Sequence, residues 1–138
     1  METDKKLLNQ NMKKTIILIL LLVMGCTHMI RADENLTSAI SSELHDNGSV
    51  CFNDIAEDFD GVLIDNCYHL KTAIKENTIK GKYPSFSNDE LIVILLKDGR
   101  IVKVAVISGE DKPYFIKYEY QQTQTVYEPD HVFCRNEY

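Results

Sequence analysis

The chain has 138 residues, 44% hydrophobic and 26% charged, which is ordinary for one globular domain and excludes collagenous, mucin-like and wholly disordered classes. The first 25 residues hold four lysines and two acids, so the remainder carries 11 lysines and arginines against 19 aspartates and glutamates. Such an acidic domain repels phosphate backbones and anionic headgroups, so the composition disfavours nucleic acid and favours a basic protein partner.

The N-terminal segment has the parts of an export signal. Lysines at 13–14 form a basic region, residues 15–24 are almost all apolar, and a small residue then precedes Cys26. As a helix, the unbroken apolar run of 11 residues would be roughly 16 Å long, against about 30 Å for the hydrocarbon core of a bilayer. We therefore expect a signal peptide over residues 1–25. Met12 is the preferred translation start, because two acids precede the lysines in the longer form.

The segment Val23-Met24-Gly25-Cys26 resembles the lipobox of bacterial lipoproteins, whose cysteine receives diacylglycerol before cleavage. The resemblance implies cleavage between Gly25 and Cys26, lipidation of Cys26, and a protein held in the cell envelope by its lipid. Because Thr27, not Asp, follows the cysteine, it also implies the outer membrane of a Gram-negative cell, with the domain facing the periplasm. The alternatives are a plain secretory signal and an uncleaved anchor extending to Arg31.

Residues 26–48 contain few large apolar side chains, as expected of a lipid-anchored tether. Leu36, Ile40 and Leu44 are four residues apart, a spacing that would also place them on one face of a short helix. Tether and helix are equally compatible with this pattern. The small periplasmic domain is expected over residues 49–138.

Within that domain, short segments predict strands and one helix. Residues 49–52 and 61–64 are rich in β-preferring side chains. Residues 66–77 place apolar side chains at helical spacing, and Asp65 or Asn66 is available as the cap. One short helix is therefore expected.

The clearest structural signal is a β-hairpin. Two apolar runs, residues 91–96 and 101–107, flank an Asp-Gly pair at 98–99, which favours a two-residue turn. Pairing outward from that turn sets Leu95 opposite Val102 and produces one wholly apolar face.

Aromatic and polar residues alternate over 114–120 and predict a third strand, and residues 126–133 suggest a closing strand around a turn. The expected fold class is therefore mainly β, with a small antiparallel sheet or sandwich and one short helix.

Three cysteines remain once Cys26 is set aside, which in an exported protein implies one disulfide and one leftover thiol. Of the three possible pairings we favour Cys51 with Cys134, because both lie on predicted strands and a bridge would tie the ends of the domain together. Cys67 would then be the leftover. Its spacing from His69 is too weak a signal for a catalytic thiol or a zinc site.

The sequence contains no phosphate-binding glycine loop, His-Glu-x-x-His or Gly-x-Ser-x-Gly motif, so we predict no enzymatic activity, no metal and no cofactor. An acidic loop lies between the first two strands. An EF-hand frame with its glycine at Gly61 would put Ala56 and Cys67 at the first and last ligand positions, and neither suits calcium. We therefore interpret the loop as a solvated surface. Its acidic residues are the candidate partner-binding patch: Asp54, Glu57, Asp58 and Asp60.

Three further segments carry a family resemblance: Asn-Gly-Ser-Val-Cys-Phe at 47–52, Lys-Asp-Gly-Arg-Ile at 97–101, and Tyr-Phe-Ile-Lys-Tyr at 114–118. With the lipobox, they make the chain similar to small enterobacterial lipoproteins described as type VI secretion immunity periplasmic lipoproteins. The resemblance implies a non-catalytic binding module that neutralises an antibacterial effector. The rival hypothesis is a structural or envelope-maintenance lipoprotein that binds a cell-envelope component.

Overall fold

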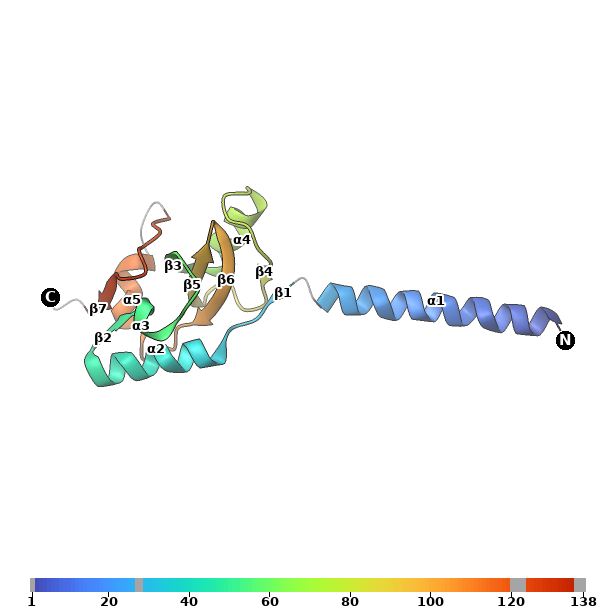
Figure 1. The fold of residues 1–138 in the computed structure, drawn as a ribbon, viewed down its shortest axis with the longest axis horizontal. Helices are drawn as coiled ribbons and strands as arrows, with labels where there is room; N and C mark the ends of the chain where they lie inside the picture. Colours follow the sequence, from blue (N-terminus) through green and yellow to red (C-terminus); the bar gives the residue numbers. More distant parts are fainter. Residues whose placement is uncertain (1, 27–28, 120–123, 136–138) are drawn as a thin grey trace.

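The computed structural model of the chain describes residues 2–26, 29–119 and 124–135. Helix α1, Glu2–Cys26, contains the apolar run of the expected signal and projects away from the other elements (Figure 1). No helix in the described part of the chain combines enough length with enough apolar character to span a membrane.

Three small sheets organise the rest of the described chain. The largest is antiparallel, in the order β3-β5-β6, and two two-stranded ladders pair β1 with β4 in parallel and β2 with β7 in antiparallel fashion. The strands are β1 Met29–Ile30, β2 Ser49–Cys51, β3 Gly61–Asn66, β4 Tyr83–Pro84, β5 Leu91–Lys97, β6 Arg100–Val106 and β7 Val132–Cys134.

The middle strand β5 is buried on both faces. Its alternate residues from Leu91 to Leu95 pack into one hydrophobic cluster, and those from Ile92 to Leu96 pack into a second cluster on the opposite face. Strand residues alternate between the two sides of a sheet, so a strand with no polar residue in this stretch requires cover on both sides. Helices α2 (Glu34–Asn47) and α5 (Lys112–Glu119) cover the first side, and α4 (Cys67–Lys75) covers the second.

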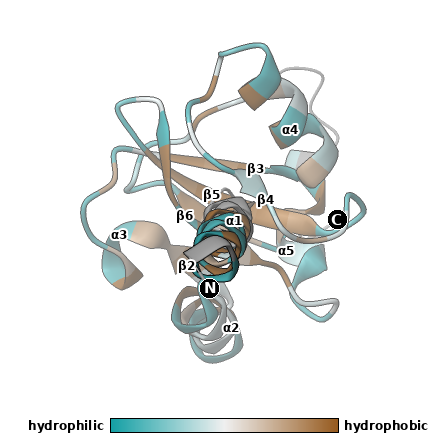
Figure 2. Ribbon diagram, turned by 90° about the vertical axis from the view of Figure 1, so that its right-hand side faces the viewer, coloured by the Kyte–Doolittle hydropathy of each residue, from teal (hydrophilic) through white to brown (hydrophobic). Residues whose placement is uncertain are grey.

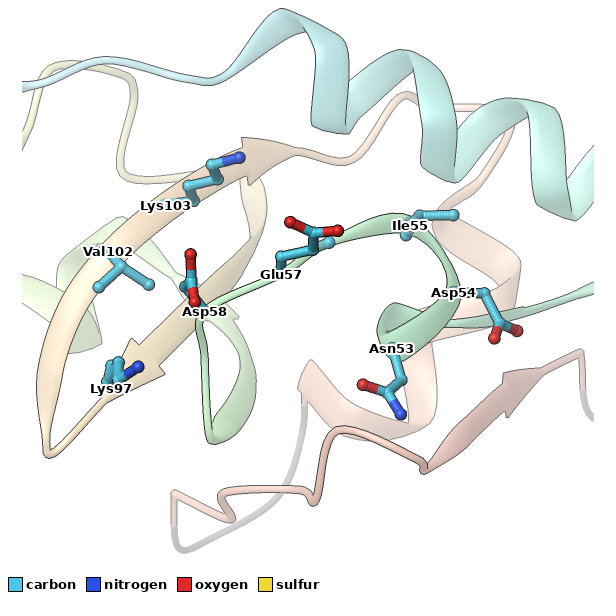
Figure 3. Close-up of a pocket in the computed structure, with 9 residues that line it drawn as sticks. Asn53, Asp54, Ile55, Glu57, Asp58, Lys97, Val102 and Lys103 are labelled. Carbon is cyan, nitrogen blue, oxygen red and sulfur yellow. The ribbon is translucent and has the colours of Figure 1, made fainter.

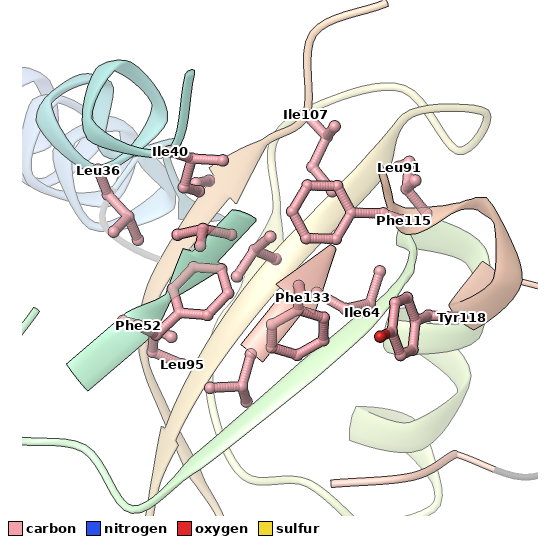
Figure 4. Close-up of a cluster of buried hydrophobic side chains, with 14 of the residues drawn as sticks. Leu36, Ile40, Phe52, Ile64, Leu91, Leu95, Ile107, Phe115, Tyr118 and Phe133 are labelled. Carbon is pink, nitrogen blue, oxygen red and sulfur yellow. The ribbon is translucent and has the colours of Figure 1, made fainter. Parts of the chain in front are cut away.

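Phe133 on β7 is the centre of an aromatic group within the first cluster (Figure 4). Its ring centroid lies 4.9 Å from that of Tyr118 and 5.4 Å from that of Phe52, both in edge-to-face geometry. Phe115 lies 5.8 Å away. These contacts join β7, α5 and the short helix α3 (Phe52–Ile55) over the sheet.

The expectation of a mainly β fold is wrong, because the described residues form five helices beside the strands. The strand expected over 114–120 is helix α5, and Tyr120 lies outside the described residues. Phe115 and Tyr118 are buried three residues apart, so helical spacing is the pattern that packing selects. Pro113 is compatible with this helix because it sits in the first turn, where its missing N–H costs no hydrogen bond.

Residues 34–47 form a helix and not a tether. The Asp33 carboxylate accepts a hydrogen bond from the Leu36 backbone N–H at 2.9 Å, and Gly48 ends α2 in the left-handed conformation with φ 69°. Leu36, Ile40 and Leu44 are all buried in the first cluster. The folded body therefore begins before residue 49, although residue 49 is the start that the sequence predicts.

The predicted hairpin is confirmed, but its register differs. Asp98 and Gly99 occupy the turn with φ values of 53° and 73°. A β-bulge beside Leu95 shifts the pairing, so Leu95 lies opposite Lys103 instead of Val102. The bulge leaves Val102 40% exposed, and the apolar face expected from simple alternation is interrupted there.

The predictions nearest to local sequence signals are confirmed. Helix α4 begins after Asn66, whose side chain accepts a hydrogen bond from the His69 backbone N–H at 2.9 Å. Strands β2 and β3 match their predicted positions. The closing strand is shorter than expected: β7 spans only three residues, and Tyr127 forms an isolated bridge to Val62.

Replacing Leu44 tests whether α2 belongs to the core. Leu44 is 1% exposed, so Leu44→Ala should lower the free energy of unfolding by about 2–5 kcal/mol, whereas exposed Ser38→Ala should change it by less than about 0.5 kcal/mol. Urea denaturation of both variants measures the difference. Equal stabilities would mean that residues 34–47 do not pack on the sheet.

Candidate functional site: an acidic groove beside the hairpin

The acidic loop begins within α3 and continues after it, and it places its apolar and charged side chains on opposite sides. Ile55, Ala56 and Phe59 are partly buried against the first cluster. Asp54, Glu57 and Asp58, which alternate with them along the chain, are exposed. The packing of the apolar residues therefore fixes the position of the three carboxylates on the surface.

These three acidic residues line a groove of about 710 Å³, in which Glu57 and Asp58 lie nearer to the hairpin than Asp54 does (Figure 3). One wall comes from α3 and the loop after it, and the other comes from Lys97, Val102 and Lys103 of the β5–β6 hairpin. The bulge in β6 contributes directly, because it turns Val102 outward at the hairpin wall. The complete lining is Asn53, Asp54, Ile55, Ala56, Glu57, Asp58, Lys97, Val102 and Lys103.

The two walls carry opposite charge. Lys103 Nζ lies 3.9 Å from Asp33 Oδ2, with both side chains partly exposed, so this ion pair is weak and leaves the lysine accessible. More than half of the lining residues are charged, whereas small-molecule sites are lined mainly by apolar groups. The groove is therefore suited to a charged surface of another macromolecule.

Asp60, the fourth candidate, has a structural role. Its Oδ2 accepts a hydrogen bond from the backbone N–H of Asp98 at 2.9 Å, and its own N–H donates to Leu96 O at 2.8 Å. These bonds fasten the acidic loop to the hairpin turn. Asp60 does not line the groove, so the candidate patch is reduced to Asp54, Glu57 and Asp58.

The expected Cys51–Cys134 bridge is absent, and Cys51, Cys67 and Cys134 are all free thiols. The two strands do pair, as the prediction required, but Cys51 lies opposite Val132. Cys51 and Cys134 are consequently diagonal neighbours, whose Cα atoms are about 7–8 Å apart, whereas the Cα atoms of a disulfide are usually about 4.4–6.8 Å apart. Cys51 Sγ instead donates to the carbonyl of Pro129 at 3.6 Å.

Cys67 is buried in the second cluster, on the far side of the sheet from the groove. Burial raises the pKa of its thiol to about 11; the Lys71 charge opposes this rise, and Glu90 and Asp65 add to it. A thiol with that pKa has little thiolate at neutral pH, and the thiolate is the nucleophile. Cys67 is thus poorly suited to catalysis.

The sequence interpretation missed a buried polar cluster at the start of α4. Asp65 is 4% exposed, and its Oδ1 lies 2.9 Å from His69 Nδ1. Its Oδ2 accepts a hydrogen bond from Gln124 Nε2 at 2.9 Å. The carboxylate thereby links β3, α4 and a segment nearly sixty residues later in the chain, and its partners compensate for its burial. Asp65 was considered only as a helix cap, a role that Asn66 takes.

Gly25 and Cys26 are the last two residues of α1. Within residues 2–26, 29–119 and 124–135, no three His, Cys, Asp or Glu side chains are arranged to hold a metal ion.

Comparison with known proteins identifies no relative. No family model, curated protein or solved structure matches this chain.

The arrangement of the thiols predicts their reactivity. At pH 8, exposed Cys134 should be alkylated rapidly, while Cys67 should stay unmodified until urea unfolds the chain, because it is buried and its pKa is raised to about 11. Peptide mass analysis after timed iodoacetamide treatment reports each cysteine separately. If Cys67 stays protected from alkylation after treatment with a reductant, its burial is supported. A disulfide-linked Cys51–Cys134 peptide pair that a reductant separates would contradict the free thiols.

Proposed function

We propose that this protein is a lipid-anchored binding module of the bacterial envelope, which neutralises a basic antibacterial effector through the acidic wall of its groove. The observation that carries the proposal is the exposure of Asp54, Glu57 and Asp58 together along one groove wall. Two resemblances in the sequence also support the proposal: the lipobox at Cys26 and the similarity to type VI secretion immunity lipoproteins.

The groove suits a protein surface with projecting cations. A lysine or arginine side chain from the partner would meet the three carboxylates, and a neighbouring acidic group would meet Lys97 or Lys103 on the opposite wall. Opposed charges on two walls fix the orientation of a partner as well as attracting it. Val102 and Ile55 supply apolar area between the charges.

Anchoring would add to this binding. From Cys26 onward the chain carries 11 lysines and arginines against 19 aspartates and glutamates, and this acidity would accelerate encounter with a basic protein. Confinement by lipid to the membrane that the effector reaches would raise the local concentration. Binding in this way requires no catalytic residue. The immunity protein would act by occupying the surface that the effector needs.

A killing assay tests the proposal. A strain lacking this gene should be killed by neighbouring wild-type cells of the same strain, and expression of the full chain should restore survival. The triple variant Asp54→Lys, Glu57→Lys and Asp58→Lys should not restore it, because like charges placed against a basic partner cost several kcal/mol of binding.

The matched control reverses three other exposed carboxylates, Asp46, Glu110 and Asp130, which lie outside the groove. This control has the same net charge as the test variant and should protect fully. Equal protection by both variants would exclude the groove. A deletion strain that survives its neighbours, but grows poorly alone with a leaky envelope, would support the envelope-maintenance hypothesis instead.

A further inference from the structure

The chain leaves very little slack between the expected lipid and the folded body. Cys26 precedes Met29 by three residues, which can span at most about 10 Å. Met29 and Ile30 form β1, which pairs with Tyr83 and Pro84 of β4. Three residues further, the Asp33 N–H donates to Val104 O at 2.8 Å, so the chain is fastened to the sheet immediately after the anchor.

One particular surface of the domain is therefore held next to the lipid. We call it the anchor face and define it by Met29, Arg31, Lys80, Lys82, Tyr83 and Arg100, all of them exposed. Its segments meet through the β1–β4 ladder and through a bridge between Lys80 and Arg100. Figure 2 looks onto this side of the molecule, with α1 directed toward the viewer and α3 at the margin.

The anchor face differs in charge from the rest of the protein. The segments 29–31, 80–84 and 99–101, which hold the anchor face, contain four lysines and arginines and no acid, although the whole chain has a net charge of −6. The next acid along the first segment, Asp33, caps α2 and lies near Lys103. The overall acidity that suggests repulsion from anionic headgroups therefore does not apply to this face.

The anchor face also exposes apolar side chains close to the expected lipid. Met29 is 55% exposed and Tyr83 is 44% exposed, and the two are direct partners across the β1–β4 ladder. Tyrosine is favoured at membrane interfaces because its ring is apolar and its hydroxyl is polar, and lysine and arginine can bury their stems while their charges meet phosphates.

We propose that the anchor face lies directly on an anionic lipid surface, so that the domain has a fixed orientation on the membrane. This inference rests on the lipid attachment at Cys26 that the proposed function includes. A cation within a Debye length of an anionic bilayer, about 8–10 Å, gains about 1 kcal/mol of attraction, and a link of at most about 10 Å holds the start of the folded body near that range. Helix α3, which carries part of one groove wall, lies at the margin of this view (Figure 2), so the groove would not be covered by the membrane.

Tryptophan fluorescence tests this orientation, because the chain contains no tryptophan. Tyr83→Trp places the probe on the anchor face, and Val132→Trp places a control probe on β7, where the side chain is 53% exposed. Each lipidated chain, purified from membranes, is reconstituted into phosphatidylglycerol or phosphatidylcholine vesicles that contain brominated lipid as quencher. Bromine quenches only a tryptophan that reaches the bilayer.

In phosphatidylglycerol vesicles, the tryptophan at 83 should be quenched and its emission shifted to the blue, while the tryptophan at 132 should resemble that in a lipid-free sample. Phosphatidylcholine, or the added changes Lys80→Glu and Lys82→Glu, should reduce quenching at 83 to the level at 132. Equal quenching of the two probes would overturn the inference.

Two other outcomes would also overturn it. An emission shift at 83 that follows protein density, and not lipid charge, would assign the face to a second copy of the chain. A chain that does not remain with the vesicles would contradict lipid attachment itself, and with it the proposed function. Chains that stay bound to the vesicles while the tryptophan at 83 is not quenched would overturn the inferred orientation but leave the proposed function intact.

Discussion

Burial of β5 on both faces is the constraint on which the other elements depend. Its six apolar residues cannot be satisfied by a single layer, so helices must cover both sides of a sheet with only three strands. Each fully buried aliphatic side chain contributes about 1.5–3 kcal/mol, and β5 buries more apolar side chains than any other element in the described part of the chain. For this reason, helix α2 packs on one side of the sheet and α4 packs on the other.

This constraint explains which parts of the fold could be predicted from sequence. The Asp98-Gly99 turn is a local signal that the sequence identifies correctly, and Asn66 is one of the two caps that it offers for α4. Residues 114–119 were misassigned because their alternation also fits a helix, and the choice depends on where Phe115 must lie to contact Phe133. Likewise, nothing near Leu44 indicates that β5 needs a covering helix. In both segments, tertiary packing determines the secondary structure.

The groove follows the same division. The acidic wall could be found from sequence, because several acidic residues in one loop between two predicted strands indicate a solvated surface. The hairpin wall could not, since Lys103 and Val102 reach the groove only through a bulge that no sequence pattern indicated. The bond from the Asp98 N–H to Asp60 joins two segments 38 residues apart, and it then holds the two walls together. A site assembled by such long-range contacts becomes visible only in the fold.

The lipid attachment that we propose at Cys26 links the groove, the anchor face and the proposed role, and the mass of one peptide tests it most directly. Trypsin digestion of the membrane fraction should yield residues 26–31, beginning at Cys26 and carrying a diacylglycerol mass that Cys26→Ser abolishes. An unmodified wild-type peptide spanning residues 15–31, with the apolar segment still attached, would contradict both cleavage and lipidation.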